Sequence, residues 1–103
     1  MHDLAHQIAN DLNIKPAQVS ATIRLLDDGA TVPFIARYRK EATGELDDGQ
    51  LRQLAQRLSY LRELNGRRTV IINSIREQGK LAPRLETALL QADNKGRLED
   101  LYL

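Results

Sequence analysis

The chain has 103 residues, of which 42% are hydrophobic and 28% charged, and its net charge is +1. This composition is typical of one globular domain with a modest core, and it argues against disorder. The chain lacks cysteine, which excludes a disulfide scaffold and removes the usual zinc-finger ligands. It shows no signal sequence and no apolar run of about 18 residues, so we expect a cytoplasmic protein without a membrane partner.

Two short helices joined by a tight turn are predicted at the N-terminus. Apolar residues recur at helical spacing from Asp3 to Leu12, and the pattern breaks at residues 13–15. Pro16 suits the first turn of a second helix because its missing N–H costs nothing there, and Gly29 can adopt the left-handed conformation that ends a helix. Residues 1–29 therefore have the outline of a helix-turn-helix hairpin.

A short third helix and a long fourth one are predicted next. The third runs from Pro33 to about Glu41 and ends at Thr43-Gly44. The fourth runs from about Asp48 to Gln78, where leucine and isoleucine recur at helical spacing, with Asp47 or Asp48 as its N-cap. Asn65-Gly66 interrupts the apolar stripe. We favour one helix with a bend there, because a glycine inside a helix costs only about 1 kcal/mol relative to alanine; two helices are the alternative.

The C-terminal part is predicted to hold two more short helices. The first covers Pro83 to about Ala92, and the last covers Leu98 to Leu103 after Gly96. No strand pattern remains, so the expected fold is all-α with five or six helices. The chain ends on three apolar residues, whereas natural termini are usually polar, and we therefore expect it to be cut from a longer protein.

The second predicted helix offers one candidate site for nucleic acid. In a helix-turn-helix its N-terminal residues face the bases, and here these include Lys15 and Gln18, with Arg24 further along. Residues 1–30 contain only two basic residues against four aspartates, however, and phosphate contacts supply most of the affinity for DNA. A hairpin that packs against the rest of the chain is the favoured interpretation.

The run Arg37-Tyr38-Arg39-Lys40 is a second candidate. A basic cluster with an aromatic ring can hold phosphate and stack a base. Four carboxylates follow, at Glu41, Glu45, Asp47 and Asp48. Arginine suits bidentate pairing with carboxylates, so structural ion pairs are favoured. On that interpretation Arg37→Ala or Arg39→Ala lowers stability by about 1–3 kcal/mol. Because Arg37 and Lys40 are three residues apart, they are also expected to share one face of the third helix.

The third candidate is the basic stretch 52–84, which has eight lysines and arginines against two glutamates. Arg52, Arg62 and Arg67 lie away from the predicted apolar stripe. A solvated helix face is the favoured interpretation, and a surface for phosphates or an acidic partner is the alternative.

Catalytic and metal-binding patterns are missing from the sequence. It has no Cys nucleophile, no Ser/His/Asp set and no phosphate-binding glycine loop. His2 and His6 are four residues apart, but a metal site needs three or four ligands in fixed geometry. We therefore expect no enzymatic activity, no cofactor and no metal.

One stretch resembles a known family. Residues 30–41 read ATVPFIARYRKE, followed by Thr43-Gly44 and Leu46-Asp47, and this run is similar to the signature of the bacterial Tex family of transcription accessory proteins. The similarity extends to Leu98–Leu103. It implies that residues 1–103 are the N-terminal helical module of a larger protein that binds DNA or RNA mainly through later domains.

The expected function is therefore a non-catalytic scaffold or interaction surface. Its partners would be the remaining domains of the parent chain and, with them, the transcription machinery. An autonomous DNA-binding helix-turn-helix domain is the alternative. Because residues 1–30 are net negative and four carboxylates directly follow the most concentrated basic run, we expect the chain alone to bind nucleic acid weakly and without sequence preference.

Overall fold

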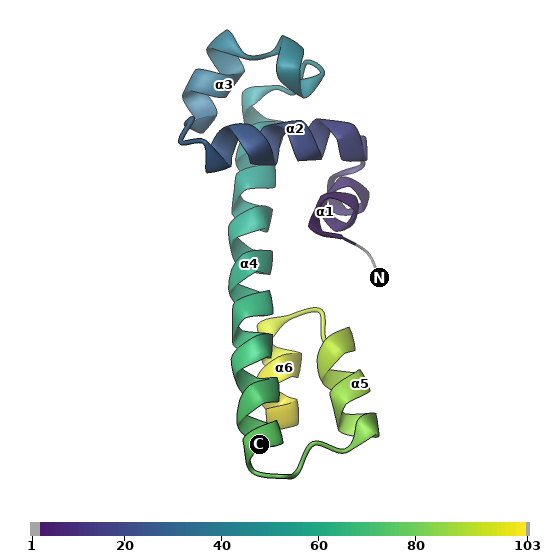
Figure 1. Cartoon of the computed structure of the whole chain (residues 1–103). Helices are drawn as coiled ribbons and strands as arrows, with labels where there is room; N and C mark the ends of the chain where they lie inside the picture. Colours follow the sequence, from purple (N-terminus) through teal and green to yellow (C-terminus); the bar gives the residue numbers. More distant parts are fainter. Residues whose placement is uncertain (1–2, 103) are drawn as a thin grey trace. The chain divides into compact units, whose positions relative to one another are not determined.

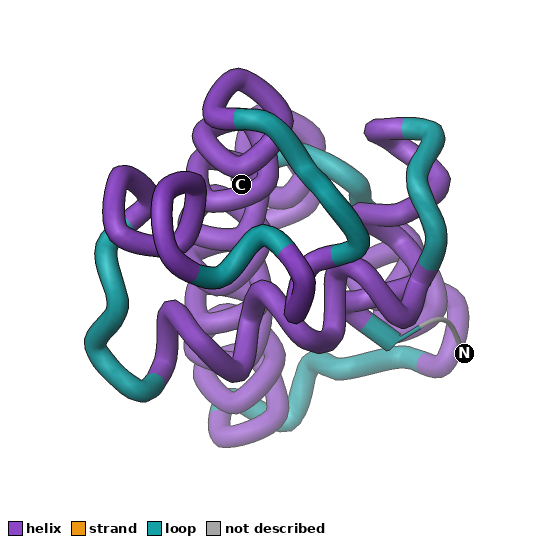
Figure 2. Tube along the Cα trace, turned by 90° about the horizontal axis from the view of Figure 1, so that it is seen from above, coloured by secondary structure: helices purple, strands orange, loops and turns teal. Residues whose placement is uncertain are grey.

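The computed structural model describes residues 3–102, and it confirms an all-α fold (Figures 1 and 2). Within this part of the chain every regular element is a helix. In order they are α1 (Leu4–Leu12), α2 (Pro16–Asp27), α3 (Val32–Tyr38), the 3₁₀ turn η1 (Glu41–Thr43), α4 (Asp48–Glu77), α5 (Pro83–Gln91) and α6 (Lys95–Tyr102).

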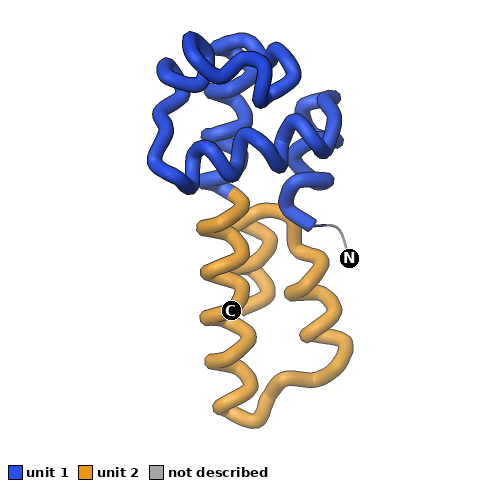
Figure 3. Tube along the Cα trace, turned by 45° about the horizontal axis from the view of Figure 1, so that its top comes forward, with its two compact units in different colours: residues 1–60 blue, residues 61–103 orange. Residues whose placement is uncertain are grey.

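The chain divides into two compact units, with unit 1 extending to Tyr60 and unit 2 beginning at Leu61 (Figure 3). Helix α4 starts in unit 1 and ends in unit 2. Each unit buries its own aliphatic residues. In unit 1 these are Ile8, Ala9, Val19, Ile35, Leu46, Leu51, Leu54 and Leu58; in unit 2 they are Leu61, Leu64, Ile71, Ile72, Ile75, Leu89, Ala92 and Leu98.

The hairpin of α1 and α2 forms with the predicted ends. The Asp3 carboxylate accepts a hydrogen bond from the His6 amide at 2.8 Å and caps α1. At the end of α2, Gly29 has a φ of +100°, and the amides of Gly29 and Ala30 donate back to the carbonyls of Leu26 and Leu25. This pair of hydrogen bonds is typical of a helix that ends at a glycine, and it confirms the prediction made for Gly29.

Helix α3 is shorter than predicted. It ends at Tyr38, not near Glu41, and Arg39 leaves helical geometry with φ −130° and ψ 33°. The carbonyl of Lys40 then accepts from the amides of Thr43 and Glu45 and from the Thr43 hydroxyl, which closes the turn η1. These local bonds replace a further helical turn. The prediction that Arg37 and Lys40 share a helix face is therefore wrong.

Helix α4 runs unbroken through Gly66, so the two-helix alternative is wrong. Asp47 caps it: the Gln50 amide donates to the Asp47 carboxylate at 2.7 Å, and the Asp47 amide donates to the Gln50 side chain at 2.9 Å. This reciprocal pair is a capping box, and it confirms Asp47 as the N-cap. Gly79, with a φ of +72°, follows the end of the helix.

Helix α6 begins earlier than predicted, at Lys95 and not at Leu98. The side chain of Asn94 accepts a hydrogen bond from the Arg97 amide at 2.8 Å, which supplies the N-cap that the sequence interpretation missed. Gly96 thus lies inside the first turn of the helix. Leu103, the predicted last residue of this helix, lies outside the described residues, as does His2.

Candidate functional site

Two of the arginines predicted to contact nucleic acid are engaged within the fold. Arg52 Nε lies 3.1 Å from the carboxylate of Asp48, one turn earlier on α4. Arg67 binds Glu99 of α6 through two bonds of 2.6 and 3.1 Å, and its guanidinium lies 5.4 Å from the centre of the Tyr102 ring. Arg62 is exposed on α4. The pairs of Arg52 and Arg67 weaken the case for both residues as phosphate contacts.

The Arg67–Glu99 pair makes the stability of unit 2 depend on pH. The hydrogen bond from Arg67 lowers the pKa of Glu99 below its ordinary value of 4.5. The hydrogen bond from Lys95 lowers the pKa of Glu63 in the same way. A carboxyl group whose pKa is lower in the folded state contributes stability that is present above its ordinary pKa and lost as the pH falls through the folded value.

We therefore expect the stability of the chain to fall as the pH drops from about 5 to about 3, and Glu99→Gln to make this pH dependence shallower. Thermal unfolding followed by circular dichroism across this range measures the effect. Glu77→Gln is the matched control, because Glu77 is exposed near the end of α4 and forms no ion pair with the described residues. Equal pH slopes for Glu99→Gln and the parent chain would contradict the assignment.

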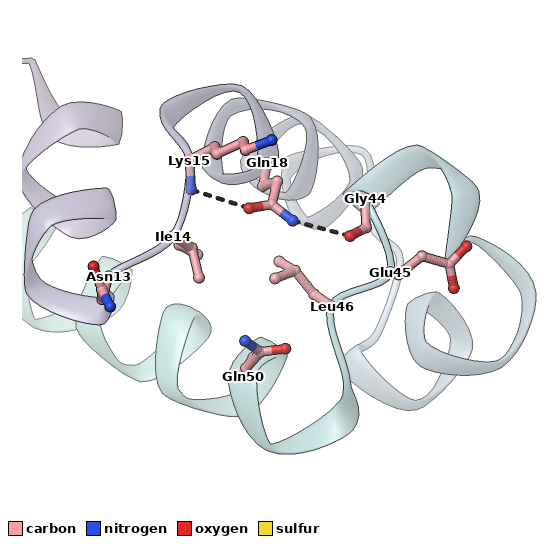
Figure 4. Close-up of a pocket in the computed structure, with 8 residues that line it drawn as sticks. All are labelled: Asn13, Ile14, Lys15, Gln18, Gly44, Glu45, Leu46 and Gln50. Atoms are coloured by element: carbon pink, nitrogen blue, oxygen red, sulfur yellow. Dashed lines mark hydrogen bonds between the residues drawn. The ribbon is translucent and has the colours of Figure 1, made fainter.

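Gln18, the predicted base-reading residue, connects two segments of unit 1 instead. Its side-chain oxygen accepts from the Lys15 amide at 3.0 Å, and its amide nitrogen donates to the Gly44 carbonyl at 3.0 Å (Figure 4). The same nitrogen donates to the Thr43 carbonyl at 3.3 Å. The side chain therefore caps α2 and holds the turn after η1 against that helix. With both ends of the amide bonded within the fold, Gln18 is poorly placed to read a base edge.

A hollow of about 400 Å³ lies beside this connection (Figure 4). Its wall includes Lys15 and Gln18 from the start of α2, Glu45 and Leu46 from the loop, and Gln50 from α4. The Glu45 carboxylate points away from the other lining residues (Figure 4). This end of α2 is therefore partly covered by the loop, whereas a reading helix must present its N-terminal residues to a groove.

Arg24 lies further along α2, in a hollow of about 460 Å³ between α1 and α2. Asp27 and Asp28 line the same hollow, with Leu4 and Ile23 as part of its apolar wall. The local carboxylates disfavour phosphate at Arg24.

The exposed side of α3 has a different character. Ile35 is fully buried and Val32 and Ala36 are half-buried, which fixes the inward side of the helix. Phe34 and Tyr38, one helical turn apart, point outward with 47% and 59% of their surface exposed. Their ring centres are 5.2 Å apart and tilted by 48°, and the Arg37 guanidinium lies 5.5 Å from the centre of the Tyr38 ring. We call Phe34, Arg37 and Tyr38 the α3 face.

Two of the four carboxylates expected to neutralise this run are engaged elsewhere. Asp47 caps α4 and Asp48 pairs with Arg52. Among the described residues, Glu41 alone forms an ion pair with the run, with Arg39 at 3.2 Å, and both side chains are largely exposed. An exposed pair contributes about 0–1 kcal/mol, so the loss expected for Arg39→Ala is smaller than the sequence suggested.

Arg37 has no acidic partner among the described residues, and Lys40 has none either. Of the predicted contact residues, the structure thus brings Arg37, Arg39 and Lys40 together at the end of α3 and leaves two of the three cations without a carboxylate. Phe34 was missed from the sequence, although the helical positions of Val32, Ile35 and Ala36 opposite it were a signal for its exposure.

The described residues contain no group of three or more His, Cys, Asp or Glu side chains placed to hold a metal ion. Between residues 3 and 102, no helix is both long and apolar enough to cross a membrane.

Comparison with known proteins finds the same family that the sequence resembles. The family model described as "Tex-like protein N-terminal domain" matches residues 2–76. Over 96 residues the chain is 62% identical to the transcriptional accessory protein Tex of Neisseria gonorrhoeae, and this aligned stretch covers 93% of this chain and 13% of that protein. It is 60% identical to protein YhgF of Escherichia coli over 96 residues, covering 93% of this chain and 12% of that protein.

A more distant relative is the human S1 RNA-binding domain-containing protein 1, at 35% identity over 97 residues, which covers 94% of this chain and 10% of that protein. The chain thus spans only about an eighth of the length of its bacterial relatives.

Proposed function

Because the chain belongs to the family of Tex-like protein N-terminal domains, we propose that it is a non-catalytic helical module of a longer, cytoplasmic transcription accessory protein. In this proposal the two units serve as a scaffold for the remaining domains, and the α3 face is the surface that meets a partner outside the chain. DNA or RNA is bound by the full-length protein, which then acts with the transcription machinery.

The observation that carries the proposal is how differently the basic residues are used. On α4, Arg57 pairs with Asp11 at 2.8 Å, Arg67 with Glu99, and Arg68 with carbonyls at the end of α5. These arginines hold the helices of each unit together, as a scaffold requires. The α3 face instead keeps two neighbouring aromatic rings exposed to solvent.

The alternative, an autonomous helix-turn-helix, gains less support. The hairpin of α1 and α2 is present, but both ends of the Gln18 amide are hydrogen-bonded within unit 1. The same end of α2 carries Glu45 beside it. We therefore prefer the scaffold function.

The test is a segment replacement in a relative. In the gonococcal protein, the matching N-terminal segment is either deleted or replaced by this chain, and thermal unfolding and RNA binding of the whole protein are measured. We expect the deletion to lower the melting temperature of the remaining protein, because a scaffold stabilises what packs on it, and the replacement to restore it. A deletion variant that melts and binds RNA like the intact protein would refute the scaffold function.

A further inference from the structure

The aromatic rings of the α3 face lie at the surface of unit 1. Phe34 and Tyr38 contact each other and Arg37 lies against Tyr38, while the buried Ile35 and the half-buried Val32 and Ala36 hold the opposite side of the helix. Arg39 and Lys40 follow directly, so five of the seven residues from 34 to 40 are aromatic or basic and none is acidic. An arginine already stacked on a ring, with more rings and cations beside it, is a combination that recognises a ligand with both flat rings and negative charge.

We infer that the α3 face binds single-stranded nucleic acid, with bases stacked on Phe34 and Tyr38 and phosphates near Arg37 and Lys40. This inference rests on the proposed function, because it names the partner class of the same surface. The site is a non-specific one: stacking accepts any base, and the surface offers no set of amide or carboxylate groups that reads a base edge.

The shape of the surface favours nucleic acid over a folded protein segment. A docking helix needs a groove for its apolar side chains. Neither of the two hollows reported above is lined by a residue of α3. A stacked base needs only an exposed ring. A duplex is disfavoured as well, since its bases are already stacked and only its phosphates remain to be bound.

Charge sets the strength of the interaction. Residues 3–60 contain seven basic and eight acidic residues, so attraction is confined to the end of α3 and the affinity is low. Two neutralised phosphates on a single strand give a logarithmic salt dependence of about −1.4, or roughly sevenfold weaker binding between 50 and 200 mM salt.

The test uses the 103-residue chain and a fluorescein-labelled 12-mer of thymidine, followed by anisotropy at 50 mM salt. A second 12-mer, with abasic sites in place of the bases, carries the same charge without rings. We expect the parent chain to prefer the thymidine strand by at least about fivefold. Phe34→Leu/Tyr38→Leu should remove this preference and bind both strands equally, while Tyr38→Phe should keep it.

Melting temperatures serve as the folding control, since both rings are exposed and their loss should barely change stability. If the double variant melts early, Phe34→Leu and Tyr38→Leu are compared singly, each expected to lose part of the preference. Equal binding of both strands by the parent chain would overturn the inference. Binding of a glutamate-rich peptide, with neither strand bound, would also overturn it and assign the surface to a protein partner. Neither result bears on the scaffold function, which the segment replacement tests separately.

Discussion

Replacing Arg68 with alanine is expected to lower the free energy of unfolding of unit 2 by about 2–3 kcal/mol. The half-buried guanidinium donates from Nε to the Leu89 carbonyl at 2.9 Å, and its other nitrogens donate to the Ala92 carbonyl and the Asn65 side chain. The two carbonyls lie at the C-terminal end of α5, where helix carbonyls lack intrahelical partners and a positive charge is favourable. Alanine leaves them without a donor.

Urea unfolding followed by circular dichroism measures this effect. Arg76→Ala is the matched control on the same helix, because Arg76 is exposed and, among the residues that the structure describes, its side chain bonds only to Asn73 of α4. A change within about 0.5 kcal/mol is expected there. Arg68→Lys should fail to restore stability, because an ammonium group cannot reproduce the planar fork that reaches both carbonyls. Parent-like unfolding of Arg68→Ala would show that α5 does not depend on this arginine.

Replacing Gly44 with alanine is expected to cost about 2–3 kcal/mol in unit 1. Gly44 has a φ of +65°, which costs a residue with a Cβ about 1–2 kcal/mol. The added Cβ would also lie 2.8 Å from Nε2 and 3.1 Å from Cγ of Gln18. The clash pushes this side chain away from the carbonyls that it binds, so the turn loses its connection to α2.

Gly66→Ala is the control, and its expected change in stability has the opposite sign. Gly66 lies in the interior of α4, and a methyl group on its Cα would meet no atom within 4 Å beyond the helix's own backbone, so alanine should raise stability by about 0.5–1 kcal/mol. In a Gln18→Ala background the clash is absent, and Gly44→Ala should cost only the backbone term, so the two substitutions should not be additive. Additive losses would show that Gln18 and Gly44 act independently.

The ends of several helices could be predicted because their signals are local. Pro16 opens α2, Gly29 and Gly79 end α2 and α4, and Asp47 caps α4 through a residue three positions away. The end of α3 could not be predicted in this way, because it depends on the amides of Thr43 and Glu45 both donating to the Lys40 carbonyl, which helical periodicity does not indicate.

The candidate site was harder to predict, because the partners of the basic residues are distant in sequence. Arg67 meets Glu99 across 32 positions, and Gln18 meets Gly44 across 26. Periodicity identifies the side of α4 that Arg67 occupies but not its partner. For the same reason, the four acidic residues after α3 appeared able to neutralise the run, although Asp48 pairs instead with Arg52 further along α4.

The central claim is that nucleic acid meets this chain at the α3 face and not at the start of α2. The most direct measurement is a ¹H–¹⁵N NMR titration of the 103-residue chain with the single-stranded thymidine 12-mer, which reports on every backbone amide except those of proline. We predict that the largest chemical-shift changes fall between residues 34 and 40, with small changes between residues 15 and 22. The largest changes at residues 15–22, or none in the 34–40 segment at millimolar ligand, would contradict the account.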